Sequence, residues 1–167
     1  MSEENSGILV GQKGNVTVVR IMGKGTHLNS HYLKQFLLQG IGEKPRAIHI
    51  DLSQCNYLDS TFLGMLAGLG CKMKERSLPS IRLINGTERI IGMLEGLGID
   101  RLFELVKEQA AADGLKELKT ASLSLEERSR EMLEAHEKLV EVSPQNEVKF
   151  RDVIALLHEK TPPSSKS

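Results

Sequence analysis

The sequence predicts an α/β domain, a mixed sheet packed with helices, followed by a C-terminal amphipathic helical hairpin. Two observations lead to this fold class. Up to about residue 110, short β-branched runs alternate with segments whose apolar residues recur at helical spacing, in the order β-β-α-β-α-β-α-β. Beyond that point, two charged amphipathic segments are separated by a proline. Alternating strands and helices form parallel or mixed sheets covered by the helices.

The first three elements are a β-hairpin and a helix. Ile8–Lys13 and Val16–Met22 are rich in β-branched and apolar residues, and Gly14 with Asn15 between them suits a tight turn. Residues 31–41 then place apolar side chains at helical spacing, and glycines mark the end of that helix.

The next elements continue the alternation. Ala47–Leu52 is short and β-rich, as an interior strand would be. Thr61–Arg76 is apolar on nearly all sides and becomes basic at its end, which suits a buried helix. Ile81–Ile84 is a further strand, and Thr87 can cap the helix after it. Leu102–Val106 is either a last strand or the start of another helix.

The C-terminal part of the chain predicts a separate pair of helices. Ser124 and Glu127 form a capping box at the start of the first helix, and Pro144 ends it. Apolar residues 125, 132 and 139 repeat at seven, which leaves open a homodimer through this hairpin instead of packing onto the domain. The predicted units are an α/β domain at 1–110, a linker at 111–123, the helical hairpin at 124–160 and a disordered tail at 161–167.

Composition limits the possible partners. Lys+Arg and Asp+Glu both number 22, which argues against binding to nucleic acid or membranes through bulk charge. No stretch approaches the roughly 20 apolar residues that cross a bilayer. Cys55 and Cys71 form no CxxC pair, so we expect buried thiols in a cytoplasmic protein and no metal or other cofactor.

The most informative segment is Leu58-Asp59-Ser60-Thr61, which lies where a strand's loop becomes a helix. In the structural interpretation, Asp59 or Ser60 only caps the helix. In the functional interpretation, a hydroxyl at a helix N-terminus accepts a phosphate, which the N–H groups and the helix dipole favour. A catalytic serine is disfavoured because Ser60 is not in a G-x-S-x-G elbow, and no other enzyme signature is found.

The segments AIHIDLSQCNYLDSTFLGMLAGL and INGTERIIGMLEGLGIDRLFEL resemble the STAS domain, the family of bacterial anti-sigma factor antagonists. The resemblance covers residues 8 to about 109, and its specific part is the D-S-T turn. It implies that Ser60, with Thr61 as a secondary hydroxyl, is phosphorylated by an anti-sigma factor that is also a serine kinase. The unphosphorylated form would bind that kinase and release a sigma factor, and a phosphatase would reset the switch. No catalysis by this chain is implied.

Two departures from the family pattern concern the partner surface. Phe62 stands where the family has glycine, so its ring either fills the core or lies at the docking surface. The loop that begins at Lys24 replaces acidic or small residues. The alternative function is therefore a STAS scaffold, a protein-interaction module without a phosphorylation switch. The predicted partner-binding residues are Lys24, Thr26, His27, Asn29, Asp59, Ser60, Thr61 and Phe62.

Overall fold

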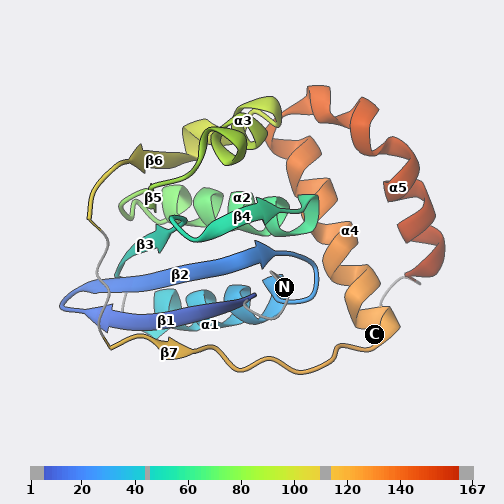
Figure 1. Cartoon of the computed structure of the whole chain (residues 1–167). Helices are drawn as coiled ribbons and strands as arrows, with labels where there is room; N and C mark the ends of the chain where they lie inside the picture. The colour runs from blue at the N-terminus through green and yellow to red at the C-terminus, as the bar shows by residue number, and fades with distance from the viewer. Residues whose placement is uncertain (1–5, 44–45, 110–113, 162–167) are drawn as a thin grey trace.

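A seven-stranded mixed sheet organises the domain (Figure 1). The computed structural model describes residues 6–43, 46–109 and 114–161. The strands lie in the order β6-β5-β3-β2-β1-β7, and β4 pairs with the end of β2. β1 and β2 are antiparallel, whereas β2, β3, β5 and β6 are parallel. The strands are β1 (Gly7–Lys13), β2 (Val16–Gly25), β3 (Ala47–Asp51), β4 (Cys55–Leu58), β5 (Ile81–Ile84), β6 (Phe103–Val106) and β7 (Lys116–Glu117).

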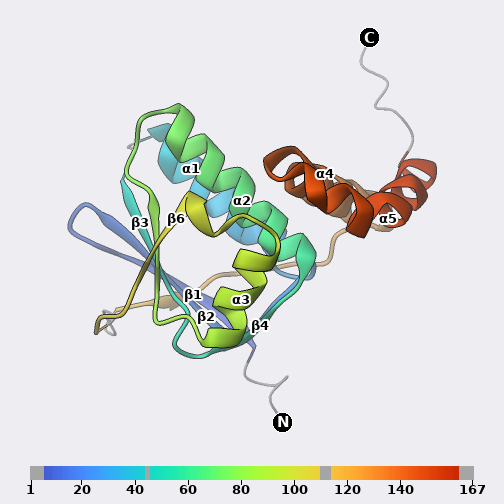
Figure 2. The same ribbon diagram turned by 90° about the horizontal axis from the view of Figure 1, so that it is seen from above.

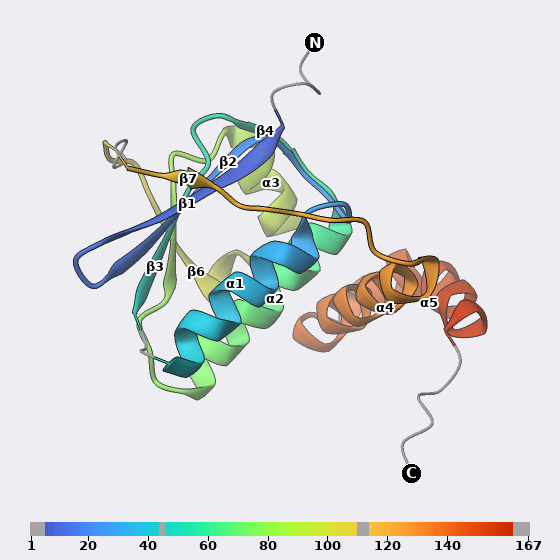
Figure 3. The same cartoon turned by 90° about the horizontal axis from the view of Figure 1, so that it is seen from below.

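Five α-helices accompany the sheet within the described residues. They are α1 (Ser30–Glu43), α2 (Ser60–Glu75), α3 (Glu88–Gly96), α4 (Leu125–Val142) and α5 (Glu147–Lys160). Figures 2 and 3 show that α1, α2 and α3 lie on one face of the sheet, while α4 and α5 lie beyond α2 on the side away from the sheet. Within the described ranges, no helix is long and apolar enough to cross a membrane. The predicted fold class is confirmed.

Two short strands were not predicted from the sequence. Cys55–Leu58 follows a loop and contains a polar residue, so it carries no β signal by itself; it pairs with β2 after a register shift at Gly23 and Lys24. Lys116–Glu117 has no β pattern either, and it pairs with β1 at Leu9 and Val10. Both strands exist because a longer neighbour offers its backbone hydrogen-bonding groups. For the segment at 102–106 the sequence left open a strand or the start of a helix, and the structure shows a strand at Phe103–Val106.

The predicted linker 111–123 is described from residue 114 onward. Besides β7, it contains a backbone hydrogen bond from Leu118 to the carbonyl of Ile8 (2.8 Å). The hydroxyl of Tyr32 on α1 donates to the carbonyl of Ala121 at 2.5 Å. The segment therefore runs along the domain before it reaches α4 (Figure 3). Residues 162–167 of the predicted tail lie outside the described residues.

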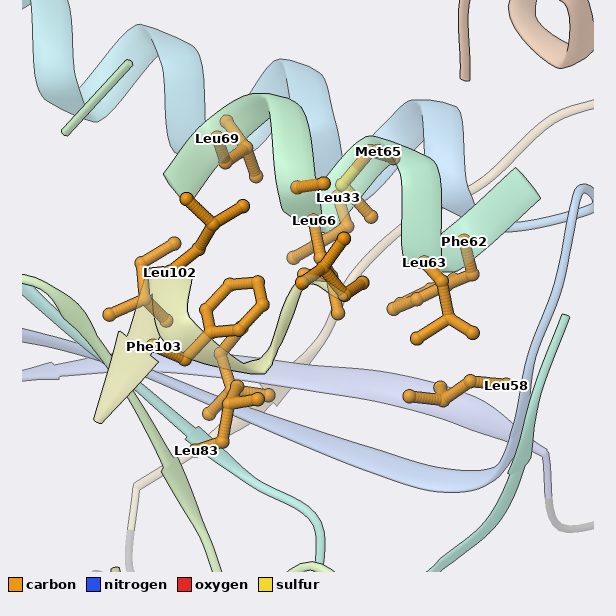
Figure 4. Close-up of a cluster of buried hydrophobic side chains, with 14 of the residues drawn as sticks. Leu33, Leu58, Phe62, Leu63, Met65, Leu66, Leu69, Leu83, Leu102 and Phe103 are labelled. Carbon is orange, nitrogen blue, oxygen red and sulfur yellow. The ribbon is translucent and has the colours of Figure 1, made fainter. Parts of the chain in front are cut away.

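The core lies between the sheet and the inner faces of α1 and α2 (Figure 4). Apolar side chains of α2 meet those of the strands and of the turn before β6, and nearly all of them are fully buried. Burial of this kind is the main stabilising contribution to such a domain. The residues labelled in Figure 4 are Leu33, Leu58, Phe62, Leu63, Met65, Leu66, Leu69, Leu83, Leu102 and Phe103.

The helical hairpin packs onto the domain. Its predicted capping box is confirmed, since Ser124 Oγ accepts from the Glu127 N–H (3.1 Å) and Glu127 Oε1 accepts from the Ser124 N–H (3.0 Å). Leu139 on α4 is fully buried in the common core. The side-chain amide of Asn146, also buried, donates to the carbonyls of Leu97 and Leu139, both at 2.9 Å. These contacts join the turn between α4 and α5 to the end of α3.

Candidate functional site

Asp59 is the residue that caps α2. Its backbone is extended (φ −84°, ψ 172°), and its Oδ1 accepts from the Phe62 N–H at 2.8 Å. Ser60 is the first residue of the helix. Of the two capping residues that the sequence allowed, the structure selects Asp59, and the hydroxyl of Ser60 remains for another partner. The interpretation of Ser60 as a cap is therefore wrong.

Asp59 also fixes the loop that follows β2. Its Oδ2 accepts from the His27 N–H at 2.9 Å and lies 3.3 Å from His27 Nδ1. Inside the loop, Asn29 Oδ1 accepts from the Thr26 N–H (2.9 Å) and Asn29 Nδ2 donates to the Lys24 carbonyl (3.2 Å). Four of the predicted partner-binding residues thus form one structured loop against Asp59. The structure brings together residues more than thirty positions apart in the chain.

The hydroxyl of Ser60 lies 2.8 Å from Nε2 of His136, a residue of α4. The other imidazole nitrogen, Nδ1, lies 2.6 Å from the backbone carbonyl of Met132. Because a carbonyl can only accept, Nδ1 carries a hydrogen, and in the neutral imidazole Nε2 then accepts from Ser60. The ring of His136 is 4% exposed and packs edge-on against Phe150 of α5, with 5.0 Å between ring centroids.

This serine–histidine contact holds a helix in place and has only part of a catalytic arrangement. In a hydrolytic triad a carboxylate faces the second imidazole nitrogen and stabilises the imidazolium that forms. Here that nitrogen faces the carbonyl of Met132. The carboxylate beside Ser60, Asp59, is already engaged with the backbone N–H groups of Phe62 and His27. We therefore interpret the contact as part of the packing of α4 on α2.

Phe62 is in the core. Its ring is fully buried, and it occupies space that Gly25 at the end of β2 leaves open. A Cβ at Gly25 would lie 2.9 Å from the ring and 2.6 Å from Leu58 Cδ2. Of the two positions that the sequence left open for this ring, the structure shows the core. Thr61 is also buried, at 3% exposure, so the secondary hydroxyl is less accessible than the half-buried Ser60.

Charged side chains border the site between α1 and α4. Lys34 Nζ lies 2.6 Å from Glu131 Oε1 and 3.5 Å from Glu134 Oε1. His31 Nδ1 lies 3.3 Å from the same Glu131 oxygen. Lys34 and the two glutamates form part of the lining of an open pocket of about 230 Å³ between α1, α2 and α4, which Met65 also lines. The α1–α4 contact is thus polar. The side chains of Lys34 and Glu131 are mostly buried, whereas Glu134 is exposed, so water weakens the pair of Lys34 with Glu134.

The two cysteines and the possible metal ligands are candidates for a second site within the described part of the chain. Cys55 and Cys71 are both free. Cys55 is buried, and burial raises the pKa of its thiol, which disfavours the reactive thiolate. Cys71 is half-buried on α2. Among the described residues, no group of three or more His, Cys, Asp or Glu side chains is placed to hold a metal ion.

Comparisons with known proteins agree with this fold. Residues 8–107 match the model of a protein family described as "Mlab, STAS domain". No curated protein sequence matches the chain. The chain is similar to the structure of the anti-sigma factor antagonist SpoIIAA in its unphosphorylated form, with a TM-score of 0.51 and 14% identity over 60% of this chain and 87% of that one.

Two further structures give the same result. The phosphorylated form of SpoIIAA, a Bacillus cell fate determinant, has a TM-score of 0.51 and 14% identity over 60% of this chain and 89% of that one. A Thermotoga maritima protein provisionally assigned as an anti-sigma factor antagonist has a TM-score of 0.54 and 16% identity over 60% of this chain and 85% of that one. At these identities the likeness shows a shared fold. The family match ends at residue 107, before the helical hairpin.

Proposed function

The chain belongs to the STAS-domain family, and from this premise we propose that it is an anti-sigma factor antagonist switched by phosphorylation of Ser60. In the unphosphorylated form it binds an anti-sigma factor that is also a serine kinase, and a sigma factor is released. The kinase phosphorylates Ser60 and thereby ends its own binding, and a phosphatase restores the active form. The chain itself is not an enzyme in this scheme.

The observation that carries the proposal is the position of Ser60 at the start of α2, beside the loop that Asp59 holds. Ser60 is half-buried. A phosphate there would add about −1.5 to −2 charges. With Asp59 next to it, it would create a strongly negative surface that repels a partner suited to the uncharged hydroxyl. The switch therefore needs no change in the fold of the domain.

The proposed docking surface consists of this turn and the loop from Lys24 to Asn29. Hydrogen bonds within the loop hold its shape before any partner arrives, which lowers the entropy lost on binding. Leu28 at its tip is 61% exposed and offers an apolar contact. Thr61 and Phe62 support this surface from inside because both are buried.

A constitutive interaction module is the second candidate function. The hydrogen bond between Ser60 and His136 favours it, because a hydroxyl that holds α4 already has a structural role. In that case the chain would scaffold a complex, and the state of Ser60 would not control binding.

Phosphosite mapping on the protein from its native cells, in growing and stressed cultures, tests the proposal. We expect a phosphate on Ser60 whose occupancy changes between the two conditions. Ser53, an exposed serine between β3 and β4, is the matched control and should carry none. A Ser60 peptide that is observed in both cultures and is always unmodified would favour the constitutive module.

Binding measurements with the purified kinase partner then separate the two functions. Ser60→Asp should abolish binding and Ser60→Ala should preserve it, whereas Ser53→Asp should leave binding unchanged. Equal affinity of Ser60→Ala, Ser60→Asp and the unaltered protein for the kinase would refute the switch.

A further inference from the structure

The helical hairpin covers the site that is proposed to be phosphorylated. Nε2 of His136 lies 2.8 Å from the Ser60 hydroxyl, and His136 is itself 4% exposed. Met132 on one side and Phe150 on the other fix the imidazole ring. The N-terminal part of α2 therefore faces a packed side chain of α4, and a kinase has no open approach to Ser60 from that direction.

A phosphoryl group does not fit the contact as it stands. It would replace the hydroxyl hydrogen that Ser60 donates, and the 2.8 Å between Oγ and Nε2 leaves no space for it. If Ser60 rotated away instead, Nε2 would be left buried without a partner, which is unfavourable.

We infer that the α4–α5 hairpin is a removable cover of Ser60, so that phosphorylation of Ser60 and docking of α4 on α2 exclude each other. The hairpin must leave before Ser60 is phosphorylated, and a phosphate on Ser60 then prevents it from docking again. Because the two events share one equilibrium, each must weaken the other by the same factor.

Helices α2 and α4 lie very close to each other at Gly64. A Cβ at Gly64, one turn after Ser60, would lie 2.3 Å from the backbone oxygen of Ala135. The absence of a side chain at Gly64 lets the backbone of α4 lie directly on α2, in keeping with the close packing of protein interiors. The hairpin also lies outside the family match at residues 8–107, so the elements that define the family do not include it.

Release of the hairpin would expose a new surface. Gly64 and Met65 on α2 are buried under it or next to it, and Leu139 on α4 would leave the core. Phosphorylation would therefore add charge to the turn at Ser60 and uncover the face of α2 that α4 now covers. This inference deepens the proposed function and rests on it for its biological role, but the coupling itself can be measured without a kinase.

The test compares full-length protein carrying Ser60 with full-length protein into which phosphoserine is incorporated at position 60 during translation. Amide hydrogen–deuterium exchange, followed by mass spectrometry, is measured for α4 and for strands β2, β3 and β5. We expect about tenfold or faster exchange in α4 when position 60 carries phosphoserine, because a buried hydrogen-bond partner is lost. The strands should exchange as in the unmodified protein.

Three controls are matched to this design. Phosphoserine at the exposed position 53 adds the same charge away from α4 and should leave its exchange unchanged. Ala135→Arg places a large side chain against Gly64 and should show the exchange of the undocked hairpin, whereas Val148→Arg on the exposed side of α5 should not.

Unchanged exchange in α4 with phosphoserine at position 60 would overturn the inference. Slower exchange would overturn it as well, because it would show the phosphate holding the hairpin in place. Faster exchange in the strands as well as in α4 would count equally against it, since the domain would be unfolding. Any of these three exchange results would overturn the coupling between phosphorylation and hairpin docking but would leave the proposed function standing. Conversely, absence of a phosphate on Ser60 in cells would refute the proposed function and would leave the exchange result unaffected.

Discussion

A substitution at Gly64 measures how closely α4 packs on α2. In Gly64→Ala the new methyl group would lie 2.3 Å from the carbonyl oxygen of Ala135 and 2.8 Å from its Cβ. Non-bonded heavy atoms are most favourably placed about 3.5–4.0 Å apart, so α4 has to move by about 1 Å. Overpacking of this size typically costs about 1–3 kcal/mol. Replacing glycine by alanine inside a helix opposes that cost with about 0.8–1.0 kcal/mol of favourable helix propensity.

Gly68, one turn further along α2, is the matched control. A Cβ there would meet only the Cγ of Lys138, at 3.8 Å, an ordinary contact. Gly68→Ala therefore gains the same helix propensity without the overlap. The difference between the two variants removes the propensity contribution, and we expect Gly64→Ala to be less stable than Gly68→Ala by about 1–3 kcal/mol.

Urea denaturation of both variants in the full chain gives this difference directly. In thermal unfolding each kcal/mol corresponds to about 2–4 °C for a chain of this size. Equal stability of the two variants would refute the reasoning, because Gly64 could then not lie against the backbone of Ala135. A lower stability of Gly68→Ala would refute it too.

Three further predictions concern single side chains. Phe62→Ala should lower the free energy of unfolding by about 3–5 kcal/mol, because the ring is fully buried; a loss below about 1 kcal/mol in urea denaturation would place the ring at the surface. Ser60→Ala should lower the free energy of unfolding by about 1–3 kcal/mol, because it leaves His136 Nε2 unpaired. A double-mutant cycle with His136→Ala should show that the two losses of stability are not additive. Additive losses would contradict the contact between the two side chains. The pKa of His49 is lowered, first by burial and then by Arg82, so the folded protein binds this proton less readily than the unfolded chain. The free energy of unfolding should therefore fall as the pH drops below 6.5, and His49→Gln should make that decline shallower; an unchanged pH profile would contradict it.

Most of the domain could be predicted from local patterns. The strands Ile81–Ile84 and Ala47–Asp51 are short runs rich in isoleucine and other apolar residues. The capping box at Ser124 indicates where α4 begins. Each of these signals resides in residues close together in the chain. The strand Cys55–Leu58 carried no such signal, because its pairing depends on the end of β2.

The site could be predicted only in part. The D-S-T turn predicted the start of α2, and the loop that begins at Lys24 was predicted to share its surface. In the structure the two are joined by the hydrogen bond between Asp59 and the His27 N–H. Phe62 was left between core and surface, since its sequence neighbours are compatible with both. Gly25, which makes room for its ring, lies at the end of β2, more than thirty residues before Phe62 in the chain. Burial of the ring is thus a property of the packing between two segments.

The sequence by itself determined the α/β domain, its STAS family and Ser60 as the residue of interest, because periodicity, caps and a short motif are properties of neighbouring residues. Only the tertiary structure decided that Asp59 caps the helix and that the hydroxyl of Ser60 meets His136. These two residues are 76 positions apart. Their contact arises because Gly64 lets α4 approach α2, and a long-range approach of that kind leaves no local pattern in the sequence.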